Sequence, residues 1–411
     1  MANKKWRIST PNWSELHFPL LELVLKKLSF LDILKFRAVC RSWNKAAKSY
    51  VFSPLLMIPG NQTESNNDHD IDNNTVWRQV FSLAEKKVYS FENSCKELGD
   101  DFWCVGSSHG WLVLLGRGLN FLVFNPFSRG KIVLPSITSL PGMNRTSPEI
   151  CISKAILISP GSSKLGKKMK SAIVIYGYIA HKLAYCNVGD KSWTELNGKN
   201  SPYSDILCCN DWLYALSYSN SVEVWDFKSN SFPIKVASFV PCEVSVPSLT
   251  IGNYSTDKYF CKKYLVESKG EILLVTRFIG YYVNVDGELL DDGDLLTDEN
   301  THPLICPYRT VEFCVHKMDL RGRRWVKVER LDDRAFFLGG NESLSFFTRD
   351  LAACKGNSIY FTDDNWEDMT SDYLYGGHDL GVYDLEKKVV EACYEFDDEK
   401  VFPPPIWIVP S

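Results

Sequence analysis

Apolar side chains near the start of the chain recur at helical spacing. Pro19 suits a first helical turn, Ser29 and Asp32 have the spacing of a capping box, and a third helix is expected from about Arg41 to Lys48. The apolar positions that carry this pattern are Leu20, Leu21, Val24, Leu28, Leu31, Leu34, Val39, Trp43 and Ala47. The pattern predicts three short helices within residues 1–59.

The hydrophobic pattern changes after residue 75. Residues 60–75 are polar, and we expect a linker or loop there. Beyond them, short apolar runs at 111–115, 172–176, 271–275 and 358–361 are separated by turn residues, which is typical of strands. The sequence therefore predicts a large all-β domain over residues 76–411.

Two degenerate repeats run through this predicted β domain. Tight turns between antiparallel strands are expected at 107–111, 208–212, 267–271 and 353–357, where Gly, Asn or Asp accepts a positive φ. A second set of turns opens at Ser82, Asn125, Asn187, Asp226, Asp319 and Asp384. The first two openers are 43 residues apart, which matches one four-stranded propeller blade. We expect a degenerate, kelch-like β-propeller of five or six blades, with residues 76–91 joining the last blade; the alternative is a pair of β-sandwiches.

The predicted helical unit is too small to bury its apolar residues by itself. A unit of about 40 residues has a large surface for its volume. Some of its apolar side chains must therefore meet another surface, either a partner protein or the large domain, against which the helices would fold back.

The string from Trp13 to Trp43 closely resembles an F-box, most specifically in FRAVCRSWNKAA. Together with SSHGWLVLL at 107–115, FLVFNPFSRGKIVLP at 121–135 and YDLEKKVV at 383–390, it resembles a plant F-box family with a C-terminal KIB-type β-propeller. The WD and kelch signatures of other propellers are absent from the sequence. The resemblance implies a substrate-recognition subunit of a Skp-cullin-F-box ubiquitin ligase, with no catalytic residue of its own.

By this resemblance, the helices would bind a Skp-type adaptor and, through it, a cullin, while the propeller would bind an unknown protein substrate. The residues that would contact the adaptor are Leu16, Pro19, Leu20, Leu23, Val24, Leu28, Leu31, Leu34, Val39, Cys40 and Trp43. Cys40 and Trp43 could equally fill the core of the helical unit. The chain departs from the family pattern at His17-Phe18-Pro19, where Pro19 replaces an acidic residue. A ligase-independent propeller scaffold that binds or sequesters a partner is therefore the alternative function.

Composition and charge narrow the classes of partner and the cellular compartments that we expect for this protein. The net charge of −4 divides unevenly, because residues 1–59 carry 10 Lys and Arg against 3 Asp and Glu. The acidic remainder disfavours nucleic acid as a partner. No apolar run is long enough to span a membrane, and 13 cysteines without a CxxC pair indicate reduced thiols and no zinc site. We expect a soluble protein of the cytoplasm, the nucleus or both.

Catalytic and cofactor motifs are absent from the sequence. No HExxH, GxSxG or GxGxxG occurs, so we expect neither a metal nor a cofactor. Paired acids at Asp291-Asp292, Asp363-Asp364 and Asp397-Asp398 are interpreted as solvated carboxylates on exposed loops. A propeller enzyme stays open as a third function, to be recognised by a cluster of reactive groups in the central channel.

Two insertions are candidates for binding. Residues 286–299 contain seven acids and no base, which makes this segment either a solubilising loop or an attractor of a basic target. Residues 363–379 combine Trp366, Tyr373, Tyr375 and His378, which are candidate substrate contacts because aromatic side chains add contact area with few rotors to freeze. Local packing is the alternative for these four. Lys164, Lys167, Lys168 and Lys170 are interpreted as surface, or alternatively as a nuclear import signal.

Overall fold

The computed structural model divides the chain into a helical unit of residues 1–52 and a β unit of residues 53–410. The residues that the structure describes are 12–48, 50–59, 77–90, 102–116, 118–142, 152–159, 169–177, 179–199, 201–228, 232–242, 259–283, 306–351, 353–365, 377–396, 401 and 403–410. The predicted linker at 60–75 and the acidic insertion at 286–299 lie outside them.

The three predicted helices are present. After a short 3-10 turn (Trp13–Glu15), they are α1 (Phe18–Leu25), α2 (Phe30–Val39) and α3 (Arg41–Lys48). Pro19 lies in the first turn of α1, and the Ser29 hydroxyl accepts a hydrogen bond from the Asp32 backbone N–H at the start of α2. The core of this unit is built from Leu21, Leu25, Phe30, Ile33, Phe36, Ala46, Ala47 and Phe52.

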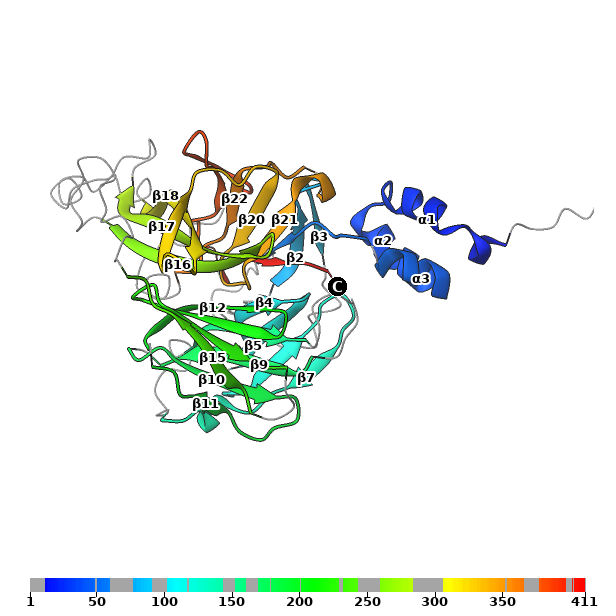
Figure 1. Ribbon diagram of the computed structural model, residues 1–411. Helices are drawn as coiled ribbons and strands as arrows, with labels where there is room; N and C mark the ends of the chain where they lie inside the picture. Colours follow the sequence, from blue (N-terminus) through cyan, green and yellow to red (C-terminus); the bar gives the residue numbers. More distant parts are fainter. Residues whose placement is uncertain are drawn as a thin grey trace, which may run out of the picture. The chain divides into compact units, whose positions relative to one another are not determined.

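The β unit is a six-bladed propeller (Figure 1). Blade 1 contains β25 (Ile406–Ile408), β1 (Leu55–Pro59), β2 (Trp77–Ser82) and β3 (Lys87–Ser90). Blade 2 contains β4 (Phe102–Ser108), β5 (Trp111–Gly116), β6 (Phe121–Phe124) and β7 (Lys131–Val133). Blade 3 contains β8 (Ile152–Ile158), β9 (Ser171–Tyr176), β10 (Lys182–Asn187) and β11 (Thr194–Leu196).

The remaining blades continue the ring. Blade 4 contains β12 (Tyr203–Cys209), β13 (Trp212–Ser217), β14 (Val222–Asp226) and β15 (Ile234–Phe239). Blade 5 contains β16 (Tyr259–Ser268), β17 (Glu271–Val283), β18 (Cys306–Asp319) and β19 (Arg324–Val328). Blade 6 contains β21 (Leu344–Phe347), β20 (Arg334–Leu338), β22 (Ser358–Phe361), β23 (Gly381–Asp384) and β24 (Val389–Glu391).

Closure of the ring differs from the expectation that residues 76–91 join the last blade. The strands β2 and β3 form the outer half of blade 1, and the C-terminal β25 supplies its innermost strand, antiparallel to β1. Figure 1 shows this red strand among the blue strands of the first blade. Trp407 of β25 is buried, and its ring lies 5.2 Å from that of Phe337 in blade 6. The two ends of the β unit thus share one sheet.

The boundary between the two units lies between Phe52 and Ser53. The sequence pattern placed it later, at residue 59. The string Leu55–Pro59 pairs with β2 on one side and with β25 on the other, so it belongs to the propeller. Four of its five residues are buried. A run of apolar residues directly after a helix can continue either unit, and only the distant partner β25 decides which.

The six turn openers each stand at the end of the strand next to the outermost one of a blade. Five of them cap their own turn with the side chain: Ser82, Asn125, Asp226, Asp319 and Asp384. Asn187 instead accepts a hydrogen bond from the Ser171 hydroxyl, while its backbone N–H donates to Asp190. One opener per blade is the sequence signal that corresponds to six blades.

Blade 6 departs from the expected meander. The strand β22 pairs in parallel with β20, because β21 and β20 form a hairpin placed at the inner end of the sheet. The prediction of an antiparallel hairpin turn at 353–357 is therefore wrong, although an apolar strand does follow it. Gly339 opens the connection between β20 and β21 with φ of +145°, a conformation that disfavours residues with a Cβ atom.

Candidate functional site

The helical unit presents an apolar surface formed mainly by α1. Leu21 and Leu25, four residues apart, point into the core, while Leu20, Leu23 and Val24 lie on the other side and are exposed. Leu23 has the largest exposed fraction of these side chains, 60%. The helix α1 thus has two apolar faces, and only one of them packs against the core of the helical unit.

None of the eleven residues assigned to adaptor binding is fully buried. Exposed are Pro19, Leu20, Leu23, Val24, Leu31 and Val39. Partly buried are Leu16, Leu28, Leu34, Cys40 and Trp43. Their role in adaptor binding stays a prediction.

Trp43 and Cys40 also have structural partners within the helical unit. The Trp43 ring lies 4.4 Å from that of Phe36, and its indole N–H donates to the Trp13 carbonyl at 2.9 Å. The Cys40 Sγ lies 3.0 Å from the Ser42 hydroxyl, where α2 gives way to α3. These two residues therefore help to hold the helices together, whatever else they contact.

Of the four candidate substrate contacts, only His378 is among the described residues. Trp366, Tyr373 and Tyr375 lie outside them. His378 is partly buried, and its ring packs edge-on against Phe396 with the centroids 6.2 Å apart. Its substrate role stays a prediction.

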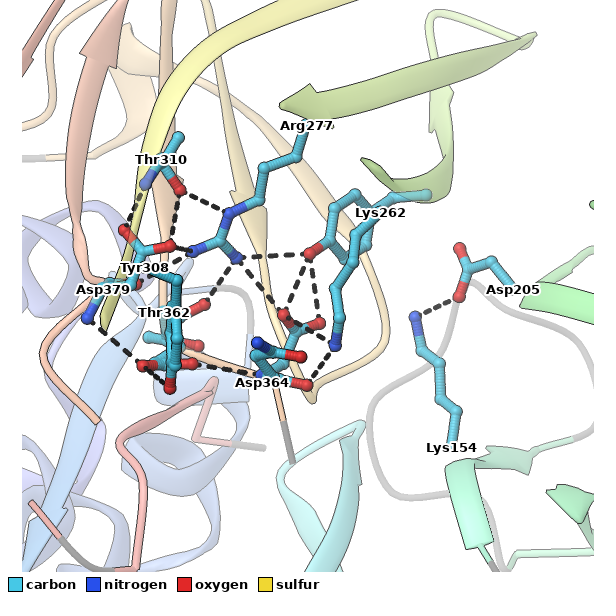
Figure 2. Close-up of polar contacts among 12 residues, drawn as sticks. Lys154, Asp205, Lys262, Arg277, Tyr308, Thr310, Thr362, Asp364 and Asp379 are labelled. Atoms are coloured by element: carbon cyan, nitrogen blue, oxygen red, sulfur yellow. Dashed lines mark hydrogen bonds and ion pairs between the residues drawn. The ribbon is translucent and has the colours of Figure 1, made fainter. Parts of the chain in front are cut away.

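A buried arginine organises the two ends of the insertion that contains these candidates (Figure 2). Arg277 projects from β17, and its guanidinium contacts the Asp379 carboxylate at 2.7 Å and the Asp364 carboxylate at 3.3 Å. It also donates to the Thr362 carbonyl and to the Thr310 hydroxyl. The two ends of the insertion are thereby held by one side chain of the neighbouring blade.

Further polar groups complete the cluster. The Tyr264 hydroxyl donates to Asp364, and Lys262 contacts the same carboxylate at 3.4 Å. Burial alone would raise the pKa of Asp364, but Lys262 and Arg277 outweigh it and lower that pKa. Burial alone would lower the pKa of Arg277, but the attraction of Asp379 outweighs it and raises that pKa.

Asp363 differs from its neighbour. Its carboxylate accepts hydrogen bonds from the Tyr308 hydroxyl at 2.9 Å and from the Asn365 backbone N–H at 3.1 Å. Burial, followed by repulsion from Asp379, raises its pKa to about 7. The interpretation of Asp363 and Asp364 as solvated carboxylates is therefore wrong, because both side chains are buried.

A second buried ion pair links three blades. Lys154 of β8 donates to Asp205 of β12 at 2.5 Å, and the other Asp205 oxygen accepts from the Leu265 backbone N–H of β16 at 2.6 Å. Burial raises the pKa of Asp205, although Lys154 opposes the shift. Figure 2 shows this pair beside the Arg277 cluster.

Glu342 connects inner strands across the ring. It lies between β20 and β21 of blade 6, yet its carboxylate accepts from the Ser108 hydroxyl in blade 2 at 2.5 Å and from the Cys208 backbone N–H in blade 4 at 3.3 Å. Its own backbone N–H donates to the Ser107 carbonyl at 2.8 Å. The connection that contains Glu342 therefore links blade 6 to blades 2 and 4.

Sequence reasoning missed Arg277, Asp379 and Glu342. A signal was present for Arg277, which is the one charged residue in the otherwise uncharged stretch from Ile272 to Val283. Asp379 and Glu342 stand beside turns, where an acid is expected on the surface, and nothing local marks them as buried.

The described residues contain neither a candidate metal site nor a membrane-spanning helix. Within these ranges, no group of three or more His, Cys, Asp or Glu side chains is arranged to hold a metal ion. The helices of the described part are all too short or too polar to cross a membrane.

Comparison with known proteins finds two families in one chain. The KIB1-4 beta-propeller family matches residues 80–384, and the F-box domain family matches residues 13–53. Similar proteins of Arabidopsis thaliana include F-box protein SKIP23, with 26% identity over 97% of this chain and 95% of its own, and F-box protein KIB2, with 25% identity over 92% and 78%. Among solved structures, the N-terminal domain of Nup159 covers 74% of this chain and 65% of its own at 12% identity, with a TM-score of 0.31.

Proposed function

Because the chain belongs to the KIB1-4 beta-propeller family and carries an F-box domain, we propose that it is a substrate-recognition subunit of a Skp-cullin-F-box ubiquitin ligase. The observation that supports this most directly is the second apolar face of α1. Leu20, Leu23 and Val24 are exposed although the helical core is complete without them. Exposed, contiguous apolar side chains on a small unit are typical of a protein-binding surface.

In this proposal the chain contributes proximity and no reactive group. The helices bind a Skp-type adaptor, the adaptor binds the cullin, and the propeller holds a target protein. Tethering raises the effective concentration of the target near the ubiquitin-charged partner, which accelerates transfer without a catalytic side chain in this chain. Ubiquitination would then direct the target to degradation.

The test is binding of a purified Skp-type adaptor to the full-length protein. We expect the intact chain to bind, and a Leu20→Asp, Leu23→Asp double variant to lose binding by at least about 100-fold, because two charges would enter an apolar interface. Both side chains are exposed, so the variant should still fold. Val133→Asp, which alters an exposed apolar residue of the propeller, is the matched control and should bind normally.

A ligase-independent scaffold is the second candidate, and the start of α1 favours it. His17 stands at the N-cap without a side-chain hydrogen bond, and Pro19 occupies the first turn where the family usually has an acidic residue. If the folded, intact protein does not bind the adaptor, the ligase proposal is refuted and the scaffold takes its place. Loss of binding in the control as well would mean that the double variant says nothing specific about α1.

A further inference from the structure

One rim of blades 3 to 5 collects exposed apolar and basic side chains on short connections. In an antiparallel four-stranded blade, the connection between strands two and three lies at the same end as the connection to the next blade. By this topology, the β9–β10 turn with Ile179, the β11–β12 connection with Lys199, and the β13–β14 turn with Tyr218 share one rim. Lys263, near the start of β16, contacts this rim from blade 5. We call these four residues the basic-apolar rim.

The apolar part of this rim consists of Ile179 and Tyr218. Their side chains are 80% and 50% exposed, although each belongs to a short turn of a well-packed blade. The ring of His181, at the end of the β9–β10 turn, packs against Tyr218 of the β13–β14 turn with the centroids 5.6 Å apart. The two turns therefore form one continuous surface.

Backbone hydrogen bonds fix the shape of the two turns. The Tyr203 N–H donates to the His181 carbonyl at 3.0 Å, and the Tyr218 N–H donates to the Pro202 carbonyl at 3.1 Å. The Ser201 hydroxyl donates to the Ala180 carbonyl at 2.5 Å. A surface held in this way loses little conformational entropy when a partner binds.

Among the described residues, the basic-apolar rim contributes two lysines, Lys199 and Lys263, whose ammonium groups have no carboxylate partner. The Lys263 ammonium donates to the Tyr218 carbonyl at 3.0 Å and has no carboxylate partner among the described residues. The neighbouring carboxylates in the described ranges are already engaged, Asp205 by Lys154, Glu223 by Lys235 and Asp364 by Lys262 and Arg277. Lys199 is exposed, and the described residues give its ammonium no carboxylate either. Burial lowers the pKa of Lys263, so an incoming carboxylate would stabilise its charged form.

We propose that the basic-apolar rim binds an acidic, extended segment of a target protein, with one apolar side chain of that segment on Ile179 and Tyr218 and its carboxylates at Lys199 and Lys263. This inference rests on the proposed function, since it assigns the surface that receives the target. Apolar contact supplies affinity, and the lysines select for acidic neighbours in the segment.

The test is selection of a random 12-residue peptide library against the folded full-length protein. We expect the enriched peptides to combine Asp or Glu with Phe, Leu or Ile, and their affinity to fall as salt is raised. Fluorescence anisotropy then compares variants. Ile179→Asp and Lys263→Glu should each weaken binding about tenfold or more, and so should Tyr218→Ala, whereas Tyr218→Phe should stay within about twofold because it keeps the ring.

Matched controls lie elsewhere on the propeller. Val133→Asp and Lys191→Glu change exposed residues of the same types in blades 2 and 3 and should leave peptide affinity unchanged. Thermal unfolding of every variant shows whether a loss of binding reflects a loss of fold. The proposal is overturned if no peptide is enriched, if the enriched peptides are basic or lack acids, or if they bind the rim variants as tightly as the wild type.

Adaptor binding separates this inference from the proposed function. The rim variants should bind the Skp-type adaptor as the wild type does, because they leave α1 unchanged. If the adaptor does not bind but acidic peptides do, the ligase proposal falls and the rim remains a binding site of a scaffold. If the adaptor binds and the peptides do not, the rim proposal alone falls.

Discussion

At Arg277, a fully buried guanidinium compensates two carboxylates from the next blade, so its removal should be costly. Arg277→Met would leave Asp364 and Asp379 buried without that partner, and we expect it to lower the free energy of unfolding by about 3–5 kcal/mol. Arg324→Met is the control, since Arg324 pairs with Asp319 at the surface and should cost about 1 kcal/mol or less. Urea unfolding measures both. Equal effects of the two changes would contradict the role assigned to Arg277.

Asp363 should make stability depend on pH. Its folded pKa of about 7 lies above the ordinary value, so the folded state holds a proton that the unfolded state has released. Its contribution to stability is therefore complete below about pH 4 and is lost as pH rises towards 7 and beyond. We expect Asp363→Asn, which keeps a neutral side chain, to gain stability relative to the wild type between pH 5 and pH 8.

The measurement for Asp363 is urea unfolding at several pH values. Asp332→Asn, at an exposed carboxylate, should follow the wild-type pH profile throughout. A difference between Asp363→Asn and wild type that stays constant over this range would show that Asp363 is ionised throughout.

The turn residues could be predicted from neighbouring positions in the sequence, whereas the buried charged residues could not. Ser29 at the start of α2 and Asp319 at the end of β18 act through partners within three positions, so a short string is sufficient to identify them. Arg277 and Asp379 are 102 positions apart, and Glu342 and Ser108 are 234 apart. Such pairs exist only when the ring has formed, and a single sequence carries no trace of their proximity.

At the scale of elements, α1 has one face for the core and one for a partner. Leu25→Ala should destabilise the helical unit by about 2–5 kcal/mol, because it removes a buried side chain. Leu23→Ala should change stability by about 0.5 kcal/mol or less while weakening adaptor binding about tenfold. Circular dichroism and the adaptor binding assay report the two effects separately. If both changes acted on stability alone, the outer face of α1 would have no binding role.

The strands were predicted well where each blade is a simple meander. Runs such as 172–176 and 271–275 correspond to β9 and β17 because apolar residues follow one another there and most of their side chains are buried. Blade 6 was predicted poorly. There β20 lies between β21 and β22 and runs parallel to β22, whereas an antiparallel neighbour was expected. A local turn signal at 353–357 cannot tell whether the strand before it pairs with the strand after it.

At the scale of the whole molecule, N-terminal deletions can locate the boundary between the helical unit and the propeller. A chain that begins at Ser53 retains all strands of blade 1 and should unfold near the temperature of the intact propeller. A chain that begins at residue 60 lacks β1, so β25 and β2 lose their common partner, and we expect it to be unfolded or aggregated. Calorimetry of the two purified chains decides the matter. Identical stability of both would place β1 outside the propeller.

Sharing of blade 1 between the two ends of the β unit also has a consequence during synthesis. After β1 leaves the ribosome, translation of the roughly 350 residues up to the end of β25 takes on the order of 20–70 s at about 5–20 residues per second. Throughout that interval the nascent ring is open, and one edge of β1 has no strand to bond with. A message truncated before the codons for β25 would yield a protein with intact helices and an unclosed propeller, which chaperones and proteases can distinguish from the closed propeller. Closure of the propeller thus depends on β25, a strand that is made long after β1.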